Sequence, residues 1–263
     1  MNARSRAGLL GSIALLAALL PAGTAGATSR PTHAPGAGDE AAPVLLMLHS
    51  GGFILGSPAS LDQAAAAAEG VGFEAVPVAY KLHDLPGAAA QVERIARRYE
   101  RQGRDVYAYG ESAGGLLASM LAEESLSEAT AVYSSISDLP AYIRHTPPPE
   151  RGVFVDALHA TRKQIRELSP VNGLSEAPVL ALTPVADSGH LNRATDRWAE
   201  RDPLVSTRDV QGGHLGLDEP DVYAANVAVA MRWLARRAHG VRHPLGNGRS
   251  QGKRATSGFL KGA

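Results

Sequence analysis

The sequence predicts an α/β fold with a mostly parallel sheet and helices on both of its faces. First, short β-branched or apolar runs alternate with stretches of helical periodicity along most of the chain. Second, the run from Pro43 to Leu48 is continuously apolar, which is typical of a strand buried on both faces. Third, glycine-rich or polar loops follow several of these runs, and functional sites in such sheets lie where the strands end.

The composition limits the class of protein. The chain has 263 residues, 44% of them hydrophobic, and its 26 basic and 26 acidic residues balance. This size suits one globular domain with room for a small insertion. A formal charge of zero gives no reason to expect a nucleic acid as partner. The absence of cysteine excludes disulfides, thiolate metal sites and a cysteine nucleophile.

The two ends of the chain differ in composition from the middle. Residues 1–27 have the pattern of an export signal, with a basic start, an apolar middle and small residues at 25–27. The apolar segment is short for a bilayer span, so an uncleaved membrane anchor is the alternative interpretation. We therefore expect a secreted protein without stable membrane insertion after cleavage. Residues 28–42 predict a flexible lead-in and residues 240–263 a disordered basic tail, flanking a domain at 43–239.

The first elements of the domain follow the expected alternation. An alanine-rich helix at 60–69 comes after the first strand, and Ser60 is its candidate N-cap. The β-rich run at 73–80 predicts the second strand. The helix at 86–101 is indicated by apolar residues at helical spacing, between an early proline and a following glycine.

The centre of the sequence is a strand, a sharp turn and a helix. The run at 106–109 and the helix at 113–123 are joined by Gly110-Glu111-Ser112-Ala113-Gly114. A Gly-x-Ser-x-Gly turn in this context holds the serine in a strained backbone state and lifts its hydroxyl above the sheet edge. The flanking glycines are needed because strand and helix crowd at the turn. Ser112 is therefore the candidate nucleophile.

The second half of the domain contains three more strands, at 131–135, 179–183 and 204–210. Helices at 191–200 and 221–237 follow the last two, and the final helix is amphipathic.

The segment 141–176 interrupts the alternation. The prolines at 147–149 are expected to stop any helix, and an amphipathic helix is expected at 155–168. We interpret this segment as a small cap inserted over the site.

A serine hydroxyl needs a base, and the base needs an orienting acid. His214 and Asp187 each lie just after a predicted strand, so their loops can bring them over Ser112. His214 would accept the serine proton, and Asp187 would fix its tautomer. The backbone N–H groups of Gly51, Gly52 and Ala113 are the candidate oxyanion donors.

Other residues could fill these roles. Asp138 also follows a strand and is the alternative acid, whereas His190 is only three residues from Asp187, which is awkward for the base. His49 is expected to brace the oxyanion loop, and Glu111 to pack or to support the site. Asp196, Asp202 and Asp209 read as solvated charges, His83, His145 and His159 as surface residues, and His239 and His243 as part of the tail. Because no cluster has zinc-ligand spacing and no loop has a nucleotide fingerprint, we expect neither metal nor cofactor.

These motifs together resemble the α/β-hydrolase superfamily, and in particular its esterase/lipase branch related to hormone-sensitive lipase. The resemblance runs from about Pro43 to Arg237. It rests on His49-Ser50-Gly51-Gly52 for that branch's His-Gly-Gly-Gly, Tyr80-Lys81-Leu82, Pro86-Gly87-Ala88-Ala89, the elbow from Gly110 to Gly115, the segment from Ala177-Pro178 to Asp187, and Gly212-Gly213-His214.

Two departures from the branch bear on the site. Ser50 replaces the first glycine, but the two donor glycines remain. The acid loop reads Thr183-Pro184-Val185-Ala186-Asp187, without the family's His-Gly pair, which leaves Asp138 open as the acid. The chain also lacks the branch's outer antiparallel strands and large N-terminal cap, which implies a trimmed sheet and a more open site.

The resemblance implies a secreted serine hydrolase that cleaves small carboxylic esters through an acyl-enzyme. A peptidase, thioesterase or acyltransferase could use the same three residues on another acyl group. A binding protein on a degenerate hydrolase fold is the non-enzymatic alternative.

Overall fold

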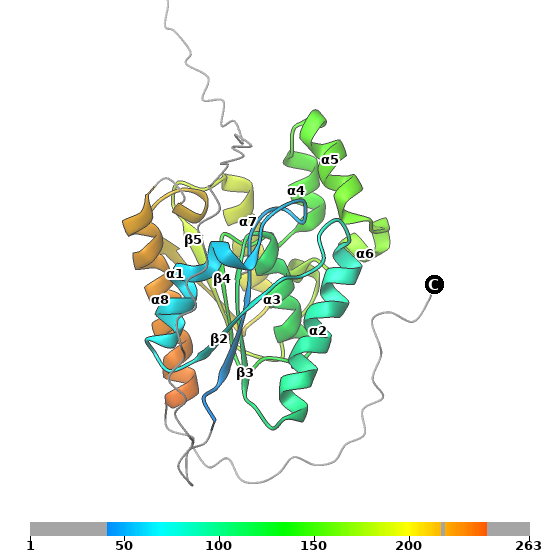
Figure 1. Ribbon diagram of the computed structural model, residues 1–263. Coiled ribbons are helices and arrows are strands. Elements are labelled where there is room, and N and C mark those ends of the chain that lie inside the picture. The colour runs from blue at the N-terminus through cyan, green and yellow to red at the C-terminus, as the bar shows by residue number, and fades with distance from the viewer. Residues whose placement is uncertain (1–40, 217–218, 241–263) are drawn as a thin grey trace, which may run out of the picture. The chain divides into compact units, whose positions relative to one another are not determined.

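A computed structural model of the protein describes residues 41–216 and 219–240. The expected export signal, nearly all of the lead-in and the basic tail beyond Gly240 lie outside these residues. The described part contains a six-stranded sheet in the order β2-β1-β3-β4-β5-β6, and each neighbouring pair is parallel (Figure 1). The strands are β1 (Val44–Leu48), β2 (Glu74–Val78), β3 (Val106–Glu111), β4 (Thr130–Tyr133), β5 (Val179–Pro184) and β6 (Val205–Val210).

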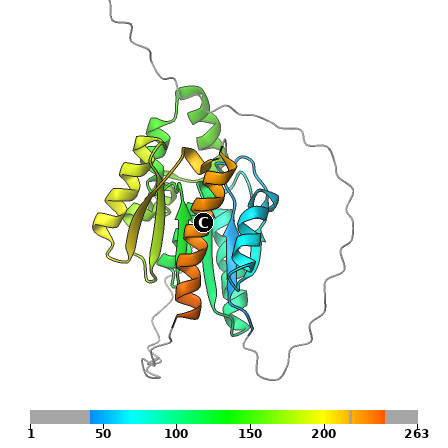
Figure 2. The same ribbon diagram turned by 90° about the vertical axis from the view of Figure 1, so that its left-hand side faces the viewer.

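Helices cover both faces of the sheet, as predicted. One face packs against α1 (Asp62–Glu69) and α8 (Pro220–His239), which lie side by side in both ribbon views (Figures 1 and 2). The other face packs against α2 (Leu85–Arg101), α3 (Ala113–Glu123) and α7 (Gly189–Arg201).

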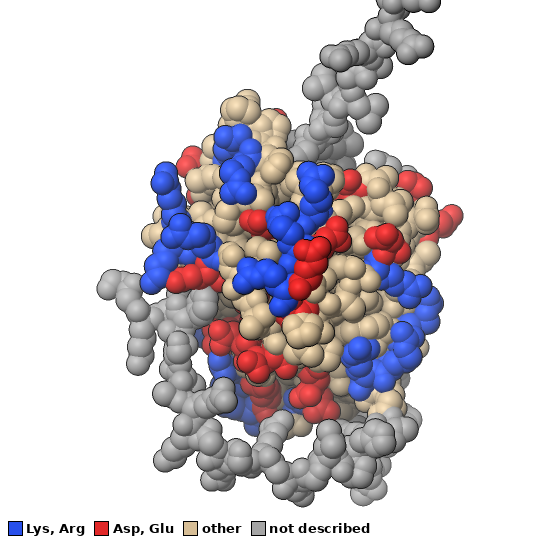
Figure 3. Space-filling view, turned by 180° about the vertical axis from the view of Figure 1, so that it is seen from behind, with Lys and Arg blue, Asp and Glu red and all other residues tan. Residues whose placement is uncertain are grey.

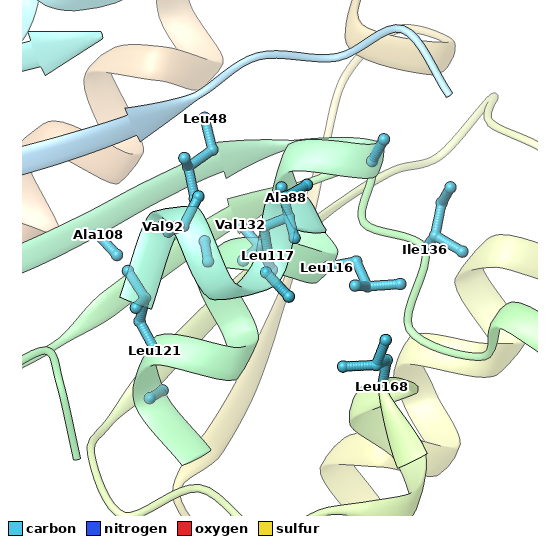
Figure 4. Packing of buried hydrophobic residues seen from close by; sticks show 14 of the residues in the cluster. Leu48, Ala88, Val92, Ala108, Leu116, Leu117, Leu121, Val132, Ile136 and Leu168 are labelled. Atoms are coloured by element: carbon cyan, nitrogen blue, oxygen red, sulfur yellow. The ribbon is translucent and has the colours of Figure 1, made fainter. Parts of the chain in front are cut away.

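The alternation of strand side chains divides the apolar core in two. In β1, Leu46 and Leu48 point to the α2 and α3 face, whereas Leu45 and Met47 point to the α1 and α8 face. Because all five residues of β1 are buried, the continuous apolar run of the sequence is explained. Figure 4 shows the half of the core that packs against α2 and α3, where Leu117 and Leu121 of α3 lie close to Val92 of α2.

The segment between β4 and β5, where the sequence predicts a cap, is mostly helical. It contains α4 (Leu139–His145), α5 (Pro148–Leu158), α6 (Arg162–Glu167) and a 3₁₀ turn at Pro170–Asn172. In Figure 1, α4 and α5 lie at the carboxyl ends of the strands.

Two expectations within the cap are wrong. Pro148 and Pro149 begin α5 instead of blocking it, because the first helical turn needs no backbone N–H. The single helix expected at 155–168 is two helices, since His159 is in the left-handed region with φ 46° and Thr161 starts α6 with a capping box.

Three further residues differ from expectation. Ser60 caps no helix, because it lies in a 3₁₀ turn at Pro58–Leu61 that leads into α1, and its hydroxyl donates to the Ser57 carbonyl. Asp202 is buried, not solvated, and accepts hydrogen bonds from the N–H groups of Ser175 and Leu204. His239 is the last residue of α8 and not part of the tail.

The surface reflects the balanced composition. Basic and acidic side chains are interspersed on the face shown in Figure 3. Among the described residues, no helix has both the length and the apolar character needed to cross a bilayer.

Candidate active site

The turn between β3 and α3 has the predicted strain. Ser112 has φ 51° and ψ −112°, a conformation that residues with a side chain rarely adopt. The glycines on either side are required by close backbone approaches. A Cβ on Gly110 would lie 2.2 Å from the Gly114 carbonyl oxygen, and a Cβ on Gly114 would lie 2.0 Å from that of Leu48. The elbow therefore exists because two positions carry no side chain.

The structure brings Ser112, His214 and Asp187 together. His214 Nε2 lies 3.1 Å from Ser112 Oγ, and His214 Nδ1 lies 3.0 Å from Asp187 Oδ2. Asp187 follows β5, and His214 begins a 3₁₀ turn, His214–Gly216, after β6. The Asp187 side chain is 3% exposed and that of His214 40%. The imidazole thus connects a buried carboxylate to the hydroxyl, an arrangement that can transfer a proton.

Asp187 is held in its charged form. Burial is the largest influence and opposes ionisation, but the hydrogen bond and charge of His214, together with hydrogen bonds from Ser188 and Ser134, outweigh it. The pKa of Asp187 is consequently below its ordinary value. Ser134 also accepts a hydrogen bond from the Leu215 N–H, so one hydroxyl supports both the acid and the loop of the base.

The structure places the alternative residues elsewhere. Asp138 is the N-cap of α4, where it accepts from the Ala141 N–H at 2.8 Å, and it pairs with Arg197 at 3.0 Å. His190 stacks on His145 with the two ring centroids 4.8 Å apart. Neither has a hydrogen bond to Ser112 or His214 among the interactions within the described residues.

The glycines after β1 lie next to the elbow. Gly51 and Gly52 both have positive φ, 118° and 63°. The close contact of Gly114 with the carbonyls of Leu48 and His49 presses this loop against the start of α3. Ala113 is the first residue of α3, so its N–H has no acceptor within the helix. The three candidate oxyanion donors, the backbone N–H groups of Gly51, Gly52 and Ala113, therefore lie on adjoining segments.

His49, which leads into this loop, is buried. Its ring stacks on Tyr80 at 4.1 Å, and the Tyr80 hydroxyl donates to the His49 carbonyl. Burial lowers the pKa of His49, although a hydrogen bond with the Ser50 carbonyl opposes this. These contacts match the expected bracing role.

Two aromatic side chains of the cap lie near the site, and no sequence motif marks them. The Phe154 ring of α5 lies 3.7 Å from where a Cβ of Gly52 would be. Tyr142 of α4 contacts both the Phe154 ring and the His190 ring. Together they connect the glycine loop to the first turn of α7, which follows the Asp187 loop. The only signal for these contacts in the sequence is the presence of aromatic residues within an insertion.

The histidine and carboxylate side chains of the described residues give no indication of a metal centre. In the part of the chain that the structure describes, no three histidine or carboxylate side chains are grouped in a way that could hold a metal ion.

Comparison with known proteins agrees with this architecture. The family model described as alpha/beta hydrolase fold matches residues 45–211. No curated protein matches the chain in sequence. Among solved structures, an esterase/lipase from an uncultured bacterium is 16% identical, over 77% of this chain and 79% of that one, with a TM-score of 0.63.

Two further structures are similar. Esterase 2 of Thermogutta terrifontis, phosphonylated by sarin, is 17% identical over 76% of this chain and 87% of that one, with a TM-score of 0.63. An acetyl ester-xyloside bifunctional hydrolase from Caldicellulosiruptor lactoaceticus is 15% identical over 73% and 82%, with a TM-score of 0.60. At such identities the likeness concerns the fold. With the family match over most of the described residues, the chain belongs to the α/β-hydrolase fold family.

Proposed function

We propose that the protein is a serine hydrolase that cleaves small carboxylic esters through an acyl-enzyme. The observation that carries the proposal is the continuous hydrogen-bonded series from Asp187 through His214 to Ser112. Its geometry falls within the range in which an imidazole can act as general base. The strained elbow supports the same role for the serine.

The proposed reaction has two halves. His214 Nε2 accepts the Ser112 proton while Oγ attacks the ester carbonyl carbon, and the N–H groups of Gly51, Gly52 and Ala113 stabilise the resulting oxyanion. When this intermediate collapses, the ester C–O bond breaks and His214 returns the proton to the leaving alcohol. Water, deprotonated by His214, then attacks the acyl-enzyme and releases the acid and free Ser112.

The similar solved structures support an ester as the substrate. They include esterase 2 of Thermogutta terrifontis, which is bound to butyrate in one structure and phosphonylated by sarin in another. Sarin modifies that relative covalently, as is expected of an enzyme with a reactive nucleophile. We extend the ester-cleaving activity to this chain.

Substitution of the nucleophile tests the proposal. Ser112→Ala is expected to lower kcat for a short-acyl p-nitrophenyl ester by about 10⁶-fold. Asp138→Asn is the matched control, because Asp138 is a carboxylate outside the relay. Turnover by Ser112→Ala at the wild-type rate would refute the proposal. Thioester and amide substrates, and an added acceptor alcohol, distinguish the related acyl-transfer activities.

We also propose that the protein is exported, with cleavage after residue 27. The support is the pattern of residues 1–27 alone. N-terminal sequencing of the protein from the culture medium tests this, since the mature chain is expected to begin at Thr28. Retention of residues 1–27 in a membrane fraction would contradict it.

A further inference from the structure

Glu111, the residue before the proposed nucleophile, is buried in a place where an apolar side chain would cost less. It is 3% exposed and makes two hydrogen bonds through one oxygen. The Tyr109 hydroxyl donates to Oε1 at 2.8 Å, and the Tyr223 hydroxyl donates to the same oxygen at 2.6 Å. Removing a carboxylate from water carries a large penalty unless such donors compensate.

Strand geometry directs Glu111 toward α8. Tyr109 and Glu111 are two residues apart in β3, so their side chains lie on the same face, the one that packs against α1 and α8. Tyr223 lies in the first turns of α8, immediately beyond the loop of His214. The two tyrosines therefore reach Glu111 from different elements, but only Tyr223 belongs to the segment that follows His214.

The His214 loop is attached to α8 at both ends. A Cβ on Gly216 would lie 3.2 Å from the Tyr223 backbone nitrogen, so the end of the loop rests on Tyr223. At its beginning, Asn226 donates to the Gln211 carbonyl at 2.9 Å and to the Tyr133 hydroxyl at 2.8 Å. The position of α8 consequently sets the position of the loop.

The loop also depends on external support because its backbone is strained. Leu215, directly after His214, has φ 59°, which is unfavourable for a residue with a branched side chain. Gly212 and Gly216 have φ 91° and 60°. Residues in such conformations stay there only when the surrounding structure fixes them.

We infer that Glu111 is a positioning residue for the proposed ester hydrolysis: it fixes the His214 loop through the Tyr223 hydroxyl and places a second negative charge, beside that of Asp187, near the imidazole. This inference rests on the proposed function. It gives Glu111 no contact with the reacting atoms.

The groups around the carboxylate fit this role. Glu111 is faced by Tyr109 from β3, Tyr133 from β4, Tyr223 from α8 and His214 from its loop. The pKa of Glu111 is above its ordinary value, because burial outweighs the hydrogen bonds of the two tyrosines and the charge of His214, which favour the charged form.

The tyrosines stay protonated and can donate. Burial, reinforced by the charge of Glu111, raises the pKa of both Tyr109 and Tyr223. The imidazole of His214 also interacts electrostatically with Asp187, Glu111 and His190. When His214 becomes protonated during the reaction, both carboxylates stabilise its charge.

Three substitutions separate the loop effect from the charge effect. Glu111→Gln keeps the shape of the side chain and removes its charge. Tyr223→Phe removes the hydroxyl that links Glu111 to α8, the helix that follows the His214 loop. Tyr109→Phe is the matched control, because it removes the hydroxyl that Glu111 binds within β3. Glu111→Gln is expected to lower kcat for a short-acyl p-nitrophenyl ester by about 10- to 100-fold, the range for one hydrogen bond to a charged group. KM is expected to stay within about twofold.

The pH profile of kcat/KM provides the second readout. In Glu111→Gln its acidic limb is expected to move to lower pH, because a negative charge that favours protonation of His214 is gone. Tyr223→Phe is expected to lower kcat by about 10-fold without moving the limb, and Tyr109→Phe to lower it less.

Rates are expressed per active site, counted by fluorophosphonate labelling, so that loss of folded protein does not count as loss of catalysis. The inference is overturned if Glu111→Gln and Tyr223→Phe both keep kcat within about twofold of wild type. It is also overturned if Tyr109→Phe lowers kcat as much as Tyr223→Phe, because the effect would then not depend on the helix that follows the His214 loop. If Glu111→Gln does not fold, Tyr223→Phe and Tyr109→Phe decide. A wild-type protein that neither hydrolyses the ester nor reacts with the probe refutes the proposed function first.

Discussion

Substituting alanine for Gly114 is expected to destabilise the protein, although alanine is normally the better helix former. Gly114 lies in α3, where helix propensity alone favours alanine by about 1 kcal/mol. The structure reverses this preference, because the added Cβ would lie 2.0 Å from the Leu48 carbonyl oxygen and 2.5 Å from that of His49. Both contacts are with backbone atoms, so neither can be relieved by a change of rotamer.

The magnitude follows from these contacts. Overpacking a filled site typically costs about 1–3 kcal/mol, and a backbone clash belongs at or above the upper end. After the propensity gain is subtracted, a net loss of about 2 kcal/mol remains. For a domain of this size that corresponds to a fall in Tm of roughly 4–8 °C.

Gly152 provides the matched control. It lies within α5, and an added Cβ would meet nothing within 4 Å. Gly152→Ala is therefore expected to raise Tm slightly, by up to about 4 °C.

The assay is thermal unfolding followed by circular dichroism, with urea unfolding as a second measure and ester turnover at 25 °C. Gly114→Ala is also expected to lose activity, because the α3 N-terminus and the glycine loop must move apart. A Gly114→Ala protein as stable as Gly152→Ala would refute the claim that the elbow is set by backbone contact.

Three other predictions concern charge and shape. Asp187→Asn is expected to lower kcat by about 10⁴-fold at pH 8 by stabilising the wrong tautomer of His214; a loss under tenfold would contradict the relay. Burial raises the pKa of Glu123 to about 8 from 4.5, so its contribution to stability falls as the pH rises between these values. Glu123→Gln is accordingly expected to melt like wild type near pH 4.5 and at a higher temperature above pH 8, and identical melting at pH 9 would contradict this. Phe154→Ala opens the cap above Gly52, so kcat/KM for p-nitrophenyl octanoate relative to butyrate is expected to rise several-fold; an unchanged ratio would place the acyl chain elsewhere.

The sequence predicted the sheet and the meeting of the three site residues because both follow from local patterns. Apolar runs mark buried strands, and in a parallel sheet the carboxyl ends of all strands lie at the same edge. Ser112, Asp187 and His214 each follow such a run. Their mutual distance therefore depends on topology, which the alternation of strands and helices largely determines.

Contacts between distant elements could not be predicted. Glu111 and Tyr109 share a strand face, but nothing in the sequence indicates that Tyr223, 112 residues away, completes the cluster. The burial of Asp202 could not be predicted for the same reason, since a strand and a helix separate it in sequence from its partner Ser175.

The structural role of Asp138, by contrast, can be read from its neighbours in the sequence. An aspartate followed by Leu139 and Pro140 is typical of a helix N-cap with proline in the first turn, which is what the structure has. The same rule explains why Pro148 and Pro149 begin a helix.

The central claim is that Asp187 and His214 make the Ser112 hydroxyl nucleophilic. The most direct measurement is reaction with a fluorophosphonate, followed by peptide mass spectrometry of the wild-type protein and of the His214→Ala variant. A single adduct on the peptide that contains Ser112, formed rapidly in the wild type and barely in His214→Ala, is the predicted result. An unmodified Ser112 in folded wild-type protein, or equal rates in the two proteins, would contradict the account.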